Sequence, residues 1–134
     1  MTRAEIAKNY FESGFACSQA VAMAFQKDVG VDLETLQKLS LPFGGGLGRL
    51  RLTCGAVSGM AIVYGLFMEA KNSPEHKMSV YEGTRELCAR FESVQGSLVC
   101  SELLAMGKKP CAEIVYSAAE ILENYLKEKG YLND

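Results

Sequence analysis

Apolar residues recur through most of the chain at intervals of three and four positions, which is the spacing of one face of an α-helix. No segment alternates apolar and polar residues cleanly, as a half-buried β-strand does. The pattern therefore predicts an all-α fold, a bundle of six or seven helices. The expected helices begin at Thr2, Cys17, Asp32, Thr53, Ser73, Ser97 and Pro110, and end near Gly14, Asp28, Ser40, Met68, Ser93, Gly107 and Gly130. No linker, repeat or low-complexity segment divides residues 1–134, which we interpret as a single domain.

Several of these helix starts carry residues that are typical of N-caps. Thr2 with Glu5 fits a capping box. Ser73 precedes Pro74, a residue that the first helical turn tolerates. The residues expected to face inward are Ala20, Val21, Ala24 and Phe25 in the second helix, and Met78, Tyr81, Leu87 and Phe91 in the helix after Ser73.

The longest uncharged run extends from Leu52 to Met68 and contains three glycines. Its length is at the lower limit for a membrane span, so a buried core helix is the preferred interpretation and no membrane span is expected. Gly55 and Gly59 share one face of this helix. Small residues at such spacing let a second backbone approach closely, so we expect a neighbouring helix, carrying another cysteine, to cross here.

Composition and charge argue against several classes of protein. The formal net charge is -2, and no basic stripe is present, so nucleic-acid binding is not expected. The N-terminus lacks the long apolar stretch of a secretory signal, and the expected location is the cytoplasm. Because that compartment keeps thiols reduced, the five cysteines are not expected to form permanent disulfides.

The positions of the cysteines are more informative than their number. Cys17, Cys54, Cys100 and Cys111 all fall in predicted first turns of helices, whereas Cys88 lies deep inside a helix and is expected to be a core residue. The partial positive charge of a helix N-terminus favours a thiolate, the form that attacks disulfides and binds metals. A bundle that brings several helix starts together would therefore cluster reactive sulfur atoms.

A glycine-rich loop precedes Cys54, with Gly44, Gly45, Gly46 and Gly48 in five residues. One interpretation is a flexible turn. The other is a loop folded closely over Cys54, with backbone N–H groups facing an anion or a cluster and with Arg49 and Arg51 lowering the thiol pKa. Under the second interpretation, the candidate cofactor-binding residues are Gly45, Gly46, Arg49 and Gly55.

The segment Cys54-Gly55-Ala56-Val57-Ser58-Gly59, with Cys17 before it and Cys100 and Cys111 after it, resembles the C_GCAxxG_C_C family of redox-active proteins. The resemblance covers roughly residues 5–125. It implies a cysteine-based redox or metal role carried by Cys17, Cys54, Cys100 and Cys111, and it assigns no counterpart to Cys88.

Three functions remain open at this point. In the first, the four cysteines cycle between dithiol and disulfide and exchange electrons with a redox partner protein. In the second, Cys17, Cys54, Cys100 and Cys111 bind an iron–sulfur cluster or another metal, since four thiolates are the ligand count of such sites. In the third, the chain is a non-enzymatic domain that forms a homo-oligomer. The sequence does not identify the metal, the substrate or the partner.

Overall fold

Three helices begin at residues whose side chains accept hydrogen bonds from the otherwise unpaired backbone N–H groups of the first turn. The Thr2 hydroxyl accepts from the Glu5 N–H at 3.1 Å, and the Glu5 carboxylate accepts from the Thr2 N–H at 2.8 Å, which completes the capping box. Asp32 accepts from the Thr35 N–H at 2.9 Å, and Ser73 accepts from the His76 N–H at 3.1 Å. The predicted caps at Thr2, Asp32 and Ser73 are confirmed.

The computed structural model describes residues 1–133, and it confirms the all-α class. Its helices are α1 (Arg3–Glu12), α2 (Cys17–Ala24), α3 (Gln26–Val29), α4 (Leu33–Ser40), the 3-10 turn η1 (Leu41–Phe43), α5 (Gly55–Phe67), α6 (Pro74–Gln95), α7 (Cys100–Met106) and α8 (Cys111–Glu128). The one β feature in this part of the chain is an isolated antiparallel bridge between Thr53 and Val99.

Two details of the predicted helices are wrong. The helix expected over Cys17–Asp28 divides into α2 and α3 at Phe25, which gives eight α-helices within residues 1–133 instead of six or seven. Phe25, which is fully buried, has φ −105° and ψ 13°, and this departure from helical geometry separates the two helices. Thr53 does not cap α5, because it pairs with Val99, and Cys54 is the N-cap residue instead.

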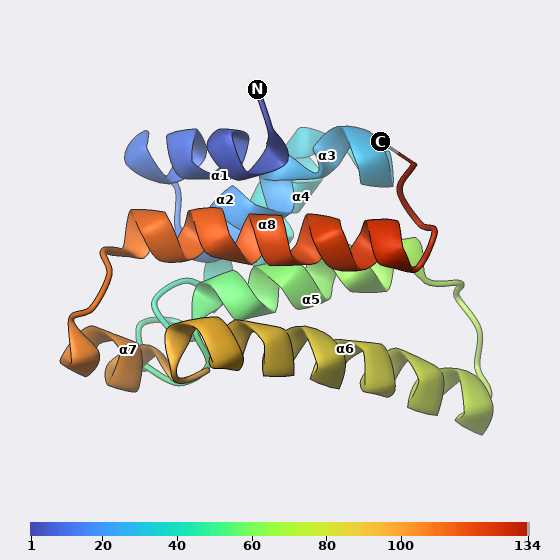
Figure 1. Ribbon diagram of the computed structural model, residues 1–134. Coiled ribbons are helices and arrows are strands. Elements are labelled where there is room, and N and C mark those ends of the chain that lie inside the picture. The colour runs from blue at the N-terminus through green and yellow to red at the C-terminus, as the bar shows by residue number, and fades with distance from the viewer. Residues whose placement is uncertain (134) are drawn as a thin grey trace.

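Helix α8 crosses the front of the molecule in Figure 1, with α1 above it, α6 below it and α5 behind it. Helix α8 packs against α1, α2, α5 and α6, and α2 packs against α1, α4 and α5. The starts of α5, α7 and α8 all lie at the left of this view, together with the loop that enters α5. The helix ends that carry cysteines therefore gather at one end of the bundle.

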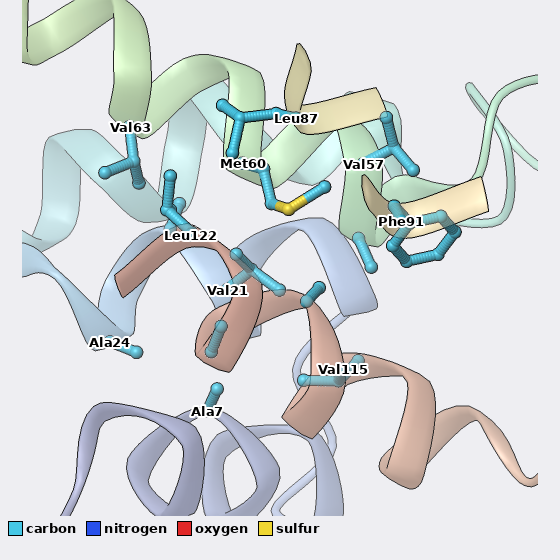
Figure 2. Close-up of a cluster of buried hydrophobic side chains, with 14 of the residues drawn as sticks. Ala7, Val21, Ala24, Val57, Met60, Val63, Leu87, Phe91, Val115 and Leu122 are labelled. Carbon is cyan, nitrogen blue, oxygen red and sulfur yellow. The ribbon is translucent and has the colours of Figure 1, made fainter. Parts of the chain in front are cut away.

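The core lies between α2, α5, α6 and α8 (Figure 2). Met60 and Val63 of α5 are buried against Val21 of α2 and Leu122 of α8. The interpretation of Leu52–Met68 as a core helix is confirmed, and no helix within residues 1–133 is both long enough and apolar enough to cross a membrane.

Helix α6 corrects one expectation about the core. Leu87 and Phe91 are buried as predicted, but Met78 and Tyr81 are 48% and 53% exposed. The first turns of α6 extend past the ends of α5 and α8 in Figure 1. The helical periodicity of α6 is therefore confirmed. It could not predict that α5 and α8, which cover this face of α6, end before its first turns.

Candidate functional site

The four cysteines at helix starts line one pocket of about 1130 Å³. Cys17, Cys100 and Cys111 are the first residues of α2, α7 and α8, and Cys54 is the N-cap of α5. Cys88 does not line the pocket and packs against the core from α6. Folding thus brings together four cysteines that are far apart in the sequence.

The β-bridge sets Cys54 beside Cys100. Thr53 pairs with Val99, and each of these residues is followed directly by a cysteine. The Cys54 N–H donates to the Leu98 carbonyl at 2.8 Å, and the Cys100 N–H donates to the Leu52 carbonyl at 2.6 Å. These two hydrogen bonds hold the starts of α5 and α7 together.

Glycines on α5 bring Cys17 to the same place. A Cβ atom at Gly55 would overlap the Cys17 sulfur, and a Cβ at Gly59 would lie 2.9 Å from the Ser18 carbonyl oxygen. Helix α2 therefore crosses α5 at the two glycines, at a distance that side chains would prevent. The prediction of a close crossing by a cysteine-bearing helix is confirmed.

The loop before Cys54 is tightly folded. Residues 45–49 all have positive φ, at 65°, 77°, 69°, 57° and 62°, and Leu47 and Arg49 are not glycines. A run of left-handed residues is costly for side chains with a Cβ, so the surrounding contacts must hold it in place. A Cβ at Gly46 would lie 2.8 Å from the Cys100 Cβ, so this buried glycine packs directly against the first residue of α7.

Most amide groups of this loop form hydrogen bonds within the loop itself. The N–H groups of residues 47–52 all donate to carbonyls between Pro42 and Leu47. These six N–H groups are therefore used within the loop, whereas contact of the loop with an anion or a cluster, expected at Gly45 and Gly46, stays a prediction. Gly45, Arg49 and Gly55 line the pocket, whereas Gly46 does not.

Burial and helix position have opposite effects on Cys54. The backbone N–H groups of Ala56 and Val57 favour its thiolate, as expected at a helix start, but burial is the larger effect. With the nearby Cys17 and Cys100 sulfurs, burial raises the pKa of the Cys54 thiol to about 12. The expectation of an ionised Cys54 is wrong, because the predicted helix position did not reveal how deeply the thiol is buried.

Cys111 is exposed, yet the pKa of its thiol is also raised. The largest cause is partial burial, followed by repulsion from Cys17 and Cys100, and the positive charge of Arg51 opposes both. Cys88 has a raised pKa as well, through burial and the charge of Glu92. The lowering of a thiol pKa by an arginine was predicted for Cys54, but no arginine is among the causes there; Arg51 acts on Cys111 instead, as the smallest of the effects.

All five cysteines are free thiols in this structure. Within residues 1–133, no three or more His, Cys, Asp and Glu side chains are grouped as a metal site requires. The four cysteines line a common pocket without forming such a group.

The sequence analysis missed several residues of the pocket. Lys109 lies on its rim, two residues before Cys111. The apolar wall consists of Phe11, Phe15, Leu41, Leu103, Leu104 and Ile114. The pair Lys108–Lys109 beside Pro110 was a visible signal, but nothing local to it indicates that Lys109 lines the same pocket as Arg49 and Arg51.

The fold and site together define an all-α thiol protein, in which four helix starts each bring a cysteine to one pocket. The chain belongs to the family described as "Putative redox-active protein (C_GCAxxG_C_C)", whose model matches residues 15–125. The resemblance carried by the motif is thereby confirmed. No curated protein and no solved structure matches the chain significantly.

Proposed function

We propose that the protein is a thiol–disulfide redox protein that uses Cys17, Cys54, Cys100 and Cys111. The observation that carries the proposal is that these four cysteines line one pocket, whereas Cys88 lies outside it. The membership in a redox-active family supports the same chemistry. The lone histidine, His76, does not line the pocket, so hydrolytic chemistry with a histidine base gains no support.

Cys17 and Cys54 are the pair that we expect to form the first disulfide. The Cys17 sulfur lies against Gly55, the residue directly after Cys54, and the two sulfurs interact electrostatically. A small-molecule disulfide is the oxidant in this step. One protein thiolate attacks it and displaces its first thiol, and the second protein thiol then displaces the other. The protein loses two electrons and two protons, and the oxidant leaves as two thiols.

Access to the four sulfur atoms is graded. Cys111 is exposed, Cys17 and Cys100 are half-buried, and Cys54 is buried. A neutral, buried thiol reacts slowly with an external disulfide, because the thiolate is the attacking form. We therefore assign Cys54 the second, resolving step, and a more accessible cysteine the first. In a reducing cytoplasm, the cycle would be completed by a partner protein that returns the disulfide to thiols.

Thiol trapping with mass spectrometry tests this proposal. After treatment with oxidised glutathione, the protein should lose about 2 Da for each disulfide, and the change should reverse with dithiothreitol. Cys88→Ser should behave like the parent, whereas Cys17→Ser and Cys54→Ser should lose the first disulfide. Five alkylatable thiols after oxidation would overturn the proposal. The metal site and the homo-oligomer stay predictions. Metal analysis after anaerobic purification tests the first, and a measurement of the mass in solution tests the second.

A further inference from the structure

The charges of the pocket have one sign. Its charged lining residues are Arg49, Arg51 and Lys109, and among residues 1–133 no Asp or Glu side chain lines it. The whole chain carries a formal net charge of -2, so this local excess of positive charge opposes the overall balance. A cavity with charges of one sign attracts ligands of the opposite sign.

The three cations also lack acidic partners within residues 1–133. No ion pair in this part of the chain involves Arg49, Arg51 or Lys109, whereas Lys8 pairs with Glu113 and Arg90 with Glu86 and Glu128. The Arg51 side chain donates a hydrogen bond from Nη1 to the Cys100 sulfur, at 3.7 Å. Their charges are therefore available to a ligand that enters the pocket.

The rest of the pocket suits an organic body. The apolar wall faces a space of about 1130 Å³, slightly more than the usual volume of a small-molecule site. Leu41 and Leu104 are 55% and 49% exposed, so a ligand would remove apolar surface from water as it binds. Apolar walls with a few charged groups are typical of sites that orient a small molecule.

We propose that the pocket binds a small organic anion with an apolar body. The negative group lies among Arg49, Arg51 and Lys109, and the apolar part lies against the apolar wall beside the cysteines. Binding of this anion needs no thiol chemistry. Its role as a reactant of the cysteines rests on the function proposed above.

A matched pair of probes separates charge from apolar contact. The fluorescent anion 8-anilinonaphthalene-1-sulfonate and the neutral N-phenyl-1-naphthylamine share the same aromatic body and differ in the sulfonate. We expect the parent to bind the anion saturably at one site, at least about tenfold more tightly than the neutral probe. Equal affinity for both probes, or no saturable binding, would overturn the proposal.

Variants locate the site. Replacing Arg49, Arg51 and Lys109 together by Gln should weaken binding of the anionic probe about tenfold and leave the neutral probe within about twofold. The control replaces Lys71, Lys77 and Arg85 by Gln, which removes the same charge from positions outside the pocket lining and should change neither affinity. A pocket variant that retains the parent affinity would overturn the proposal.

The apolar wall has its own test. Leu104→Asn should weaken both probes, whereas Met78→Asn, at a comparably exposed position outside the pocket lining, should weaken neither. If the parent binds the anion but forms no disulfide, the redox function is overturned and the anion site is retained. If it forms the disulfide but does not bind the anion, the anion site is overturned and the redox function is retained.

Discussion

The sulfur of Cys17 occupies the position that a Cβ atom at Gly55 would need. The glycine of the family motif therefore has a physical role, which is to admit the start of α2 next to Cys54. Such a Cβ would also lie 3.0 Å from the Phe43 carbonyl oxygen, which is backbone and cannot rotate away.

Two glycines of α5 provide a matched comparison. Gly55→Ala should lower the free energy of unfolding by about 1–3 kcal/mol, because the added methyl group overpacks the crossing with α2. The methyl group added by Gly65→Ala has no atom within 4 Å. This substitution should raise the free energy of unfolding by about 0.5–1 kcal/mol, because alanine has the higher helix propensity. Denaturant unfolding of both variants under reducing conditions measures the difference. Equal effects would contradict the close crossing.

Cys54 should make stability depend on pH. Its folded-state pKa of about 12 lies above the ordinary value near 8.5, so the stabilisation is complete below about pH 8.5 and is lost as pH rises toward the folded value. Between pH 8.5 and 10, the parent should lose up to about 1.4 kcal/mol per pH unit relative to Cys54→Ala. Unfolding curves in a reductant across this range test it, and parallel curves would show that Cys54 is not shielded from water.

Arg51 should control the reactivity of Cys111. Its positive charge lowers the pKa of the Cys111 thiol against the larger effects of burial and of the Cys17 and Cys100 sulfurs. Arg51→Gln should therefore slow alkylation of Cys111 at pH 8 by about two- to threefold, since less thiolate is present. Peptide mass spectrometry after brief iodoacetamide treatment gives the rate. Arg85→Gln on α6 is the control, and an equal slowing there would indicate a general charge effect.

The ion pairs that Arg3 forms with Asp28 and Glu123 are largely buried, and they should stabilise the fold more than a surface pair does. Arg3 contacts Asp28 at 2.7 Å and Glu123 at 2.5 Å, and these side chains are less than a fifth exposed. Glu123→Gln should cost about 1–2 kcal/mol, below the full value for a buried pair because of the remaining exposure. Glu34→Gln breaks a largely exposed pair with Lys38 and should cost under about 0.5 kcal/mol. Thermal unfolding of the two variants compares the pairs, and similar shifts would contradict the role of Arg3.

Sequence-local signals located most of the elements. The caps at Thr2, Asp32 and Ser73 act within three residues of themselves, so they are visible before any folding is considered. The errors arose where distant contacts overrule local preference. Thr53 leaves its predicted capping position because it pairs with Val99, a residue 46 positions away.

The sequence by itself determined the all-α class, the placement of Cys17, Cys100 and Cys111 in first helical turns, and the glycines that permit a close crossing. Helix periodicity, capping and glycine geometry are properties of neighbouring residues, so they are visible in the sequence. Tertiary structure alone decided which sulfurs face the same pocket, how deeply Cys54 is buried, and that Lys109 joins Arg49 and Arg51. Burial and electrostatic fields depend on groups brought together from across the chain, and no local pattern contains that information.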